Sequence, residues 1–589
     1  MPLTDLGKYI DLLAAEGELH QVDVEVDPYL EIAEIHRRVI ERQGPALLFT
    51  RVKGSTFPVA TNLFGSSRRL ELAFGRRPQN FVAELVNLAE RLGPPSLGMI
   101  WAKRGLLRQA LAIGSKRVGR APVLECQQDP PRLTELPLLT SWDTDGGAFV
   151  TLPLVYTEHP DGHGHNLGMY RIHRYDDQTT GIHWQIHKGG GYHYHEAEQR
   201  GQALPVTLYI GGPPALILAA IAPLPENIPE LLLASLLMGQ KLPLVASPTG
   251  HHPLVATAEF AAQGLVPPGL RRQEGPFGDH YGYNSLAHDY PVFQVSRLYH
   301  RKKAIYPATV VGQPRQEDYY IGDFLQDLLS PLFPLVMAGV RQLKTFGDTG
   351  FHSLAAARVR DRYPREAFAA GLRILGEGQL SLTKFLIVTD GDLDVADFPR
   401  LWRHVLERIN WQTDLFVLAN VSQDTLDYTG PSVNKGSKAL MMGLGREPIR
   451  VLPEAFTGEL PAGVGHPVAF LAGTLVVDGE SFARDRALPE RLAASPELAG
   501  WPLIILVDDA RAATVSLKRF LWSVFTRFEP AADLHGAATT VRRFHVGLTP
   551  PIVFDCRMKP WYPHVLEVDL KTKAQVDARI ARILPARWR

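Results

Sequence analysis

The sequence predicts a mixed α/β (α+β) protein with three domains, at residues 1–115, 116–315 and 316–589. Three observations lead to this prediction. Helical and strand patterns alternate in the first and last parts, short strand-like segments separated by Gly, Pro and Asp fill the middle, and one pattern occurs twice near the C-terminus. Gly312–Asp318 has the composition of a linker, which sets the last boundary.

The first domain is predicted from amphipathic helices and short strands. Apolar residues between Leu3 and Ala15 fall on one helical face, and residues 28–41 repeat the pattern. Residues 22–26 alternate as a strand does, and two more strands are expected at residues 44–50 and 57–62. No motif in this domain indicates a catalytic or binding site, so we interpret the domain as a structural scaffold.

Short strands dominate the central domain, which favours a barrel or a sandwich. One helix interrupts them: Pro229 suits a first-turn position, and a helical run continues to Met238 before Gly239. The strands are expected at residues 148–156, 206–210, 216–218 and 292–295.

The third domain contains a weak internal repeat. Residues 386–402 and 504–522 each have the pattern of an apolar strand, an acidic turn and a helix with a tryptophan. Both copies continue to a lysine-bearing segment, which ends at Lys438 in one and at Lys559 in the other. We interpret the repeat as a duplicated βα unit packed on one sheet, with residues 453–502 as an insertion between the copies.

Composition narrows the classes of function. The 62 Lys and Arg residues balance 62 Asp and Glu residues, so no net charge attracts nucleic acid or an anionic membrane. The two cysteines, Cys126 and Cys556, exclude a disulfide framework and a cysteine-based zinc site. No signal-peptide pattern is visible, and the apolar runs are interrupted well short of the roughly 20 residues of a membrane helix. We expect a cytoplasmic protein.

The segment from Asn166 to Gly191 carries the most unusual side chains. It is predicted as a β-hairpin, yet histidines, Asn, Arg and Lys alternate in it with aromatic residues and glycines. Asn166 and His187, with one carboxylate, could hold a hard divalent cation such as Mn²⁺ or Mg²⁺. The alternative is that His187, His193 and His195 are surface histidines beside a glycine-rich turn.

Two further motifs supply acidic groups. Glu274 and Asp279 flank a rigid Gly-Pro-Phe-Gly loop, which can hold both carboxylates in one pocket at a fixed separation. Such carboxylates take different pKa values when one lies near an arginine and the other against an apolar wall. The alternative is an acidic turn capped by aromatic residues. Glu230 begins the helix after Pro229, where a glutamate ordinarily complements the helix dipole.

These motifs, in this order, resemble the UbiD family of reversible decarboxylases. The likeness covers most of the chain and weakens within residues 453–502. It implies an N-terminal α/β domain, a central split β-barrel that binds flavin, and a C-terminal α/β domain. The internal duplication and the insertion in the C-terminal domain make this a long-form member. The segments that match are Asn166–Arg171, His187-Lys-Gly-Gly, Pro225–Glu230, Glu274–Asp279 with Gly282-Tyr283, Arg301–Gly312 and Gly436–Lys438.

The resemblance implies prenylated FMN as cofactor, together with Mn²⁺ and often K⁺. A UbiX-type flavin prenyltransferase would supply the cofactor. Lys438 would reach the cofactor phosphate, with Lys559 as the alternative. The metal that bridges to this phosphate would be held by Asn166, His187 and Glu230. The flavin would be lined by Met169, Tyr170, Arg171, His183, Trp184, Gln185, Lys188 and Gly189.

The resemblance also implies that Arg171, Glu274 and Asp279 form the catalytic set. Loss of CO₂ from an aromatic carbon leaves a carbanion with no sink, and the family's cofactor delocalises that charge. Arg171 would orient the substrate carboxylate by a two-pronged contact, and Glu274 would hold Arg171. Asp279 would donate the proton that replaces CO₂, provided that an apolar wall raises its pKa.

The implied function is reversible decarboxylation of an aromatic acid in quinone synthesis. A naphthoate-type menaquinone precursor and a polyprenyl-hydroxybenzoate are the two expected substrates, and another aromatic or heteroaromatic acid is the alternative. A prenylated substrate would bring the protein to a membrane surface, and a homo-oligomer, dimer or hexamer, is expected. The competing classes are a metal hydrolase built on His193 and His195 and a non-catalytic flavin-binding protein.

Overall fold

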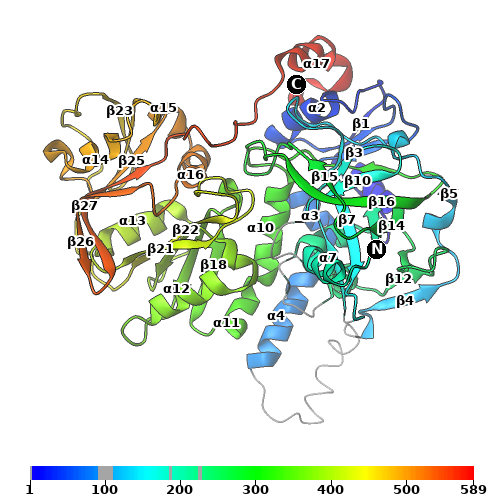
Figure 1. Ribbon diagram of the computed structural model, residues 1–589, viewed down its shortest axis with the longest axis horizontal. Coiled ribbons are helices and arrows are strands. Elements are labelled where there is room, and N and C mark those ends of the chain that lie inside the picture. The colour runs from blue at the N-terminus through cyan, green and yellow to red at the C-terminus, as the bar shows by residue number, and fades with distance from the viewer. Residues whose placement is uncertain (1–2, 91–110, 163, 185–188, 223, 225–228) are drawn as a thin grey trace. The chain divides into compact units, whose positions relative to one another are not determined.

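The computed structural model describes residues 3–90, 111–162, 164–184, 189–222, 224 and 229–589 (Figure 1). The chain divides into two compact units, a first unit of Met1–Leu328 with His564–Arg589 and a second unit of Leu329–Pro563. The predicted mixed α/β class is confirmed, because helices accompany several sheets in both units. The division into three domains at residues 115 and 315 stays a prediction.

The N-terminal part of the first unit forms a four-stranded sheet in the order β1-β2-β3-β17. The strand predicted at residues 22–26 lies earlier, because β1 pairs in register with β2 only from Leu19 to Val22. The other predicted elements of this part are present. Their bounds are α1 Leu6–Ala15, β1 Leu19–Val22, α2 Glu31–Glu41, β2 Ala46–Phe49, β3 Val59–Thr61, α3 Ser67–Phe74, α4 Arg77–Glu90 and β17 Tyr306–Pro307.

A ten-stranded sheet forms the centre of the first unit. Its main path runs β6-β9-β10-β16-β14-β11-β7-β8, with β5 and β15 also paired to β16, and every pairing in it is antiparallel. The centre is therefore rich in strands, as the sequence predicted. The strands are β5 Cys126–Gln128, β6 Phe149–Val150, β7 Pro153–Glu158, β8 His165–Gly168, β9 Ile172–Arg174, β10 Thr179–Ile182, β11 Leu204–Ile210, β14 Phe260–Val266, β15 Arg271–Glu274 and β16 His288–His300.

The predicted hairpin within residues 166–191 is only partly right. β9 and β10 form it, with Thr180 opposite Arg174, but β8 pairs with β7 instead. The expected second strand is also wrong at its end, because Gly189 begins the helix α7 (Gly189–Gln199). Gly189 allows a close approach there, since a Cβ on it would lie 2.3 Å from Oδ1 of Asn166.

Two short helices, α8 (Pro214–Ile221) and α9 (Glu230–Met238), pack against each other. The strand predicted at residues 216–218 is wrong: this buried apolar run lies within α8, and such a run shows no period that separates helix from strand. The second helix is confirmed, with Pro229 before its first turn and Gly239 ending it in the left-handed conformation. Nearby, β4 (Ser115–Val118), β12 (Leu242–Val245) and β13 (Leu254–Val255) form a small sheet.

The second unit contains two five-stranded sheets with the same topology. Their orders are β18-β19-β20-β22-β21 and β23-β24-β25-β27-β26, and in each the two outer pairings are antiparallel and the two inner ones parallel. The predicted internal duplication is thereby confirmed. The strands are β18 Val340–Thr345, β19 Leu354–Val359, β20 Phe385–Thr389, β21 Leu415–Ser422, β22 Lys435–Gly443, β23 Val464–Leu471, β24 Thr474–Gly479, β25 Leu503–Val507, β26 Leu534–Arg542 and β27 His545–Asp555.

The copies do not share one sheet, as the sequence had suggested, because antiparallel edge strands bound the parallel centre of each. The segment interpreted as an insertion, residues 453–502, holds β23, β24 and α14 (Leu488–Ala493). These take the places that β18, β19 and α12 (Glu366–Gly376) occupy in the first copy, so the duplicated unit is larger than the repeat pattern indicated.

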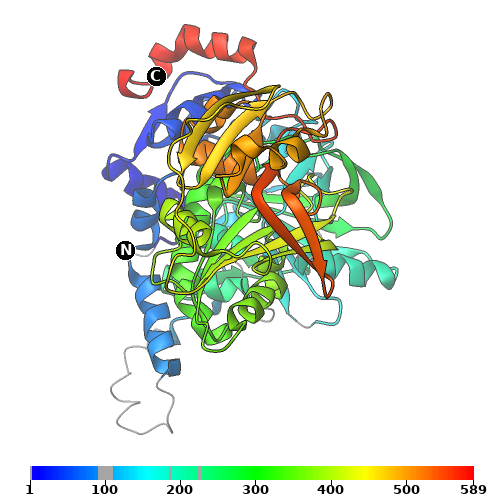
Figure 2. The same ribbon diagram turned by 90° about the vertical axis from the view of Figure 1, so that its left-hand side faces the viewer.

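In Figure 2 the β26–β27 hairpin of the second copy stands out in red-orange.

The two copies share one hydrophobic core, to which α13 (Phe398–Arg408) and α16 (Leu517–Phe525) both contribute. Trp402 of α13 lies in this core, and its Nε1 donates to Oγ1 of Thr474 at 2.8 Å, which ties the first copy to the second. Its counterpart in α16, Trp522, is also buried, but the guanidinium groups of Arg519 and Arg527 lie over its ring. The helices of the duplication therefore pack together although the sheets are separate.

α17 (Leu570–Ile583) returns the end of the chain to the first unit, where it packs on α2. Arg579 pairs with Glu31 at 3.0 Å, and Asp577 pairs with Arg38 at 2.6 Å. Within the described part of the chain, no helix combines the length and hydrophobicity that crossing a bilayer requires.

Candidate active site

The central sheet brings together Arg171 and Glu274, which are 103 positions apart. Arg171 lies between β8 and β9, Glu274 ends β15, and β10 and β15 both pair with β16. After Glu274 the chain turns at Gly275, whose φ of +85° favours glycine. This turn directs the following residues back toward Arg171.

The guanidinium of Arg171 joins the two predicted acids. Its Nε and Nη2 donate to the two carboxylate oxygens of Glu274 at 2.7 and 2.8 Å, a two-pronged pairing that suits a planar guanidinium. Its Nη1 donates to Oδ2 of Asp279 at 2.9 Å. The side chains are 8%, 0% and 11% exposed, respectively, so little water reaches them. The structure thus gathers the three residues predicted as the catalytic set, whose catalytic role stays a prediction.

Sequence reasoning missed the groups that fix Arg171 from other sides. Ser285 Oγ accepts a hydrogen bond from Arg171 Nη2 at 2.9 Å and another from the Phe277 amide at 3.2 Å. The Phe277 ring lies 5.0 Å from the guanidinium carbon, close enough for a cation–π contact. Ser285 directly follows the Gly282-Tyr-Asn segment, so its position beside the motif was the available signal.

Asp145 was also missed, because its Thr-Asp-Gly-Gly context has the pattern of an ordinary turn. Its Oδ1 accepts from the Gly278 amide at 2.8 Å, and its Oδ2 accepts from the amides of Ser141 and Trp142 at 2.9 and 3.0 Å. Burial raises the pKa of Asp145 to about 6. Asp145 therefore anchors the loop that carries Asp279.

The surroundings of Glu274 favour the ionised form of its carboxylate. Burial disfavours the carboxylate, but Arg171 and a hydrogen bond from His183 outweigh burial and lower the pKa of Glu274 to about 2. His183 Nδ1 donates that bond at 3.0 Å, and the His183 ring lies 4.3 Å from the ring of Tyr290. Burial, with Arg171 nearby, lowers the pKa of His183, so the ring is neutral.

The pKa of Asp279 is not raised, so the condition placed on its proton-donor role is not met by an apolar wall. Burial acts to raise it, but the hydrogen bonds and charge of His280, with the charge of Arg171, lower the pKa instead. The reason is that donors occupy both carboxylate oxygens: Arg171 bonds to Oδ2, and the amide and ring of His280 bond to Oδ1. Asp279 is therefore ionised in this structure.

Two of the three expected metal ligands lie in neighbouring segments. Asn166 is in β8, next to Leu167, whose amide donates to Oε2 of Glu230 at 3.1 Å. Glu230 makes no ion pair with any residue that the structure describes, and burial raises its pKa. A half-buried carboxylate beside an amide oxygen suits a hard cation. The third ligand, His187, lies outside the described residues, within which no metal-binding cluster of three His, Cys, Asp or Glu occurs.

Several residues predicted to line a flavin surround Asn166. The Tyr170 hydroxyl accepts bonds from Asn166 Nδ2 and from the Gly190 amide, both at 3.1 Å. Met169 is half-buried. Trp184 Nε1 and His183 Nε2 are buried without a hydrogen-bond partner in the described structure. Such atoms are rarely left unpaired, so they fit a polar group of a bound cofactor. Gln185 and Lys188 lie outside the described residues.

Lys438 and Lys559, the alternatives for the cofactor phosphate, are not at equivalent positions of the duplication. Lys438 lies within β22 and donates to the carbonyls of Ser381 and Thr383 at 2.6 and 3.0 Å, which uses two of its three N–H groups. Burial lowers the pKa of Lys438 to about 8, with Lys384 acting in the same direction.

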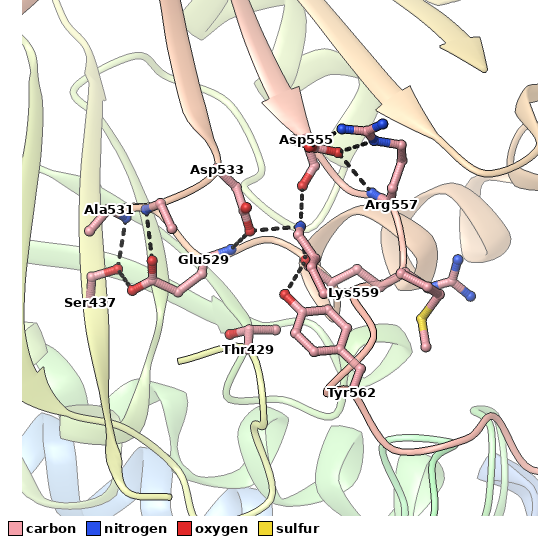
Figure 3. Close-up of polar contacts among 12 residues, drawn as sticks. Thr429, Ser437, Glu529, Ala531, Asp533, Asp555, Arg557, Lys559 and Tyr562 are labelled. Carbon is pink, nitrogen blue, oxygen red and sulfur yellow. Dashed lines mark hydrogen bonds and ion pairs between the residues drawn. The ribbon is translucent and has the colours of Figure 1, made fainter. Parts of the chain in front are cut away.

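Lys559 lies beyond the end of β27, in the cluster shown in Figure 3. Its Nζ pairs with Asp533 at 2.9 Å and donates to the carbonyls of Asp555 and Arg527 at 2.7 and 3.2 Å. Three partners occupy its three N–H groups. This cluster therefore explains Lys559 as part of the fold of the second copy.

Models of one protein family match most of the chain. Models of the 3-octaprenyl-4-hydroxybenzoate carboxy-lyase family match the chain in its N-terminal domain at residues 10–89, its Rift-related domain at 116–314 and its C-terminal domain at 319–443. The chain belongs to the UbiD family. It is a carboxy-lyase of that family, as the sequence resemblance implied.

The relatives agree with this membership. A protein of Chlamydia pneumoniae whose name describes part of a 4-hydroxybenzoate decarboxylase is 50% identical over 576 residues, 98% of this chain and 97% of that protein. Among solved structures, the closed form of vanillic acid decarboxylase from Sedimentibacter hydroxybenzoicus is 24% identical with a TM-score of 0.66, over 78% of this chain and 96% of the other. An evolved dimeric form of the UbiD-class enzyme HmfF from Pelotomaculum thermopropionicum, in complex with prFMN, is 24% identical with a TM-score of 0.61, over 75% and 95%. At such identities the two structures support the fold.

Proposed function

We propose that this protein decarboxylates an aromatic carboxylic acid with prenylated FMN as cofactor, and that the reaction reverses when CO₂ is abundant. The observation that carries the proposal is the buried group in which Arg171 is held by Glu274 and Asp279. Membership of the UbiD family supports the reaction class. The prFMN complex of HmfF supports the choice of cofactor.

The cofactor would lie along the residues around Asn166. His183 and Trp184 offer unpaired nitrogen atoms, and Gly189 leaves room beside Asn166. When bound, prenylated FMN supplies a sink for the electron pair that CO₂ leaves behind. The proposed lining is Met169, Tyr170, Arg171, His183, Trp184, Gln185, Lys188 and Gly189.

We further propose that Asn166, His187 and Glu230 hold Mn²⁺, with K⁺ as an additional ion. The Glu230 carboxylate, which forms no ion pair among the described residues and whose pKa burial raises, supports a cation at this place. Lys438 would contact the cofactor phosphate, since the hydrogen bonds of Lys559 are accounted for by its own cluster.

Arg171, Glu274 and Asp279 would each have a different role toward the substrate. Arg171 would orient the carboxylate that will leave, through the charge of its guanidinium, which Glu274 holds rigidly by the two-pronged contact. Glu274 stays ionised and keeps Arg171 in place. Asp279, on the other side of the guanidinium, delivers a proton to the carbon that loses CO₂. In the carboxylation direction the same group removes that proton.

The substrate that we propose is a hydroxybenzoate-type or naphthoate-type acid used in quinone synthesis. Menaquinone is the expected end product of that pathway. The name of the Chlamydia pneumoniae relative supports a hydroxybenzoate ring. A UbiX-type prenyltransferase would supply the cofactor, and the protein would assemble as a homo-oligomer. A prenylated substrate would require contact with a membrane surface. An acid outside quinone synthesis is the alternative.

The test is direct. The protein is purified after co-expression with a flavin prenyltransferase, its absorbance spectrum is recorded, and CO₂ release from a panel of hydroxybenzoates and naphthoates is followed by mass spectrometry. Modified flavin and release from at least one acid are expected. A protein that carries the flavin yet releases no CO₂ from any acid would support the non-catalytic alternative.

A further inference from the structure

Asp279 is bonded to a residue that sequence reasoning passed over. Oδ1 of Asp279 accepts from the His280 amide at 2.6 Å and is hydrogen-bonded to Nδ1 of the same residue. Because Asp279 is an ionised acceptor, the ring nitrogen is the donor in this contact. One proton therefore lies between the two side chains, on the histidine side.

Exposure increases outward along this chain of groups. The Glu274 side chain is 0% exposed, that of Asp279 is 11% exposed, and that of His280 is 26% exposed. Arg171 and Glu274 close the inner side of Asp279. Water thus reaches His280 far more readily than the buried carboxylate behind it.

The proposed reaction consumes one proton for every CO₂ released. Asp279 is the proposed proton donor, yet His280 and Arg171 keep it ionised, so the carboxylate does not store that proton. A second acid, Asp318, lies close enough to His280 for their charges to interact, and burial raises its pKa to about 6. Asp318 lies in the first turn of α10 (Glu317–Leu329), and its Oδ1 has no hydrogen-bond partner in the described structure.

We propose that His280 is the proton relay that recharges Asp279 between turnovers, an inference that rests on the proposed decarboxylase function. The Nδ1–H bond of the imidazolium breaks as an O–H bond forms at Oδ1 of Asp279, and the same carboxyl group gives its proton to the substrate carbon. A proton from bulk water then restores the imidazolium. One solvent proton is consumed and one C–H bond is formed for each CO₂ that leaves.

The discriminating variant is His280→Asn. Asparagine keeps an N–H donor near the place of Nδ1 and so continues to position Asp279, but it does not carry a proton. Flavin content and KM should stay within about twofold of wild type, while kcat falls by about 10² or more, as expected for losing a proton-transfer group. Added imidazole should restore part of kcat. His251→Asn, at an exposed histidine of the same unit, is the matched control and should match the wild type.

A second readout does not depend on turnover. In ¹⁵N-histidine NMR, the signal that His280→Asn removes should report a doubly protonated ring at pH 7 in the wild type. In Asp279→Asn the same ring should lose that extra proton. A ring that is neutral in both proteins would overturn the relay.

The outcomes separate the two proposals. Normal CO₂ release by the wild type, with an unchanged kcat in His280→Asn or a loss that imidazole does not relieve, would overturn the relay alone. No CO₂ release by the wild-type holoenzyme would overturn the relay and the proposed function together.

Discussion

At the scale of single residues, the site depends on the shape of one guanidinium. Arg171 donates hydrogen bonds to Glu274, Asp279 and Ser285 from three different nitrogens of its guanidinium. A lysine is a point charge on a flexible stem and would not meet these acceptors together.

We therefore predict that Arg171→Lys retains the flavin but lowers kcat/KM by about 10² or more, as removal of a fixed charge-orienting group does. Flavin absorbance and CO₂ release measured on the same sample test this. Arg297→Lys, which changes a partly exposed pair with Asp129, is the control. Near-normal turnover of Arg171→Lys would contradict the orienting role.

The lowered pKa of Glu274 makes part of the stability depend on pH. Its pKa is about 2 in the folded protein against 4.5 ordinarily, so the stabilisation is complete above pH 4.5 and is lost as pH falls toward 2. The shift corresponds to about 3 kcal/mol at most.

Glu274→Gln should therefore reduce the free energy of unfolding most at pH 7, and the difference from wild type should narrow below pH 4.5. Urea unfolding at several pH values measures this difference. A gap that stays constant from pH 7 to pH 3 would show that the ion pair does not govern this part of stability.

How far the sequence predicted the site is clearest from these residues. Arg171, Glu274 and Asp279 were identified together because the motifs that carry them are distinctive. Asp145 and Ser285 escaped notice, since each acts through a hydrogen bond fixed only by the tertiary fold. His280 escaped notice although it directly follows Asp279. The pKa of Asp279 is lowered because His280, its neighbour in sequence, and Arg171, which is distant in sequence, both donate to its carboxylate.

At the scale of elements, the junction of β8 and α7 sets the space for a bound group. The first residue of α7, Gly189, faces the amide of Asn166, which lies in β8. A methyl group placed there would collide with Asn166 Oδ1 at 2.3 Å, and backbone strain is not involved because no positive φ is present at Gly189.

We predict that Gly189→Ala lowers metal and flavin content together, while the unfolding temperature changes by a few degrees at most, because the clash is local. Elemental analysis, absorbance and thermal unfolding test this. Gly119→Ala is the control, since a Cβ there meets nothing within 4 Å. Full occupancy of both groups in Gly189→Ala would remove Asn166 from the proposed metal site.

Elements were predicted well where a period was visible. The amphipathic helices of the first unit are present, and so are the strand and helix of each repeat copy, whereas the alternating strand predicted at residues 22–26 lies at Leu19–Val22. The failures are the buried run of α8, which has no period, and the second sheet of the duplication, whose first strands lie in residues 464–479.

At the scale of the whole molecule, the duplication divides the second unit into a first copy, which the family models match, and a second copy, which they do not. The family models end at residue 443, which is also the end of β22 and of the first copy. The match to the Chlamydia pneumoniae relative covers 98% of this chain, so that protein shares the second copy. The second copy is thus a feature of this group of long chains, beyond the part that the family models match.

The last helix contributes to the core of the first unit. Val576, Ile583 and Leu584 are 0–2% exposed within that core, and two ion pairs join α17 to α2. At about 1.5–3 kcal/mol for each buried side chain, removing residues 564–589 should destabilise the first unit by about 5 kcal/mol or more.

Truncation after Pro563 should therefore lower the unfolding midpoint of the first unit, measured by thermal unfolding. Arg579→Ala alone should have a much smaller effect, because it removes one partly exposed ion pair. An unchanged midpoint in the truncated protein would show that α17 adds nothing to the core.

The return of α17 also bears on how the chain is made. During synthesis the ribosome must finish the whole second unit before the segment that completes the first unit emerges. Until then, the side of α2 that packs against α17 stays exposed to solvent.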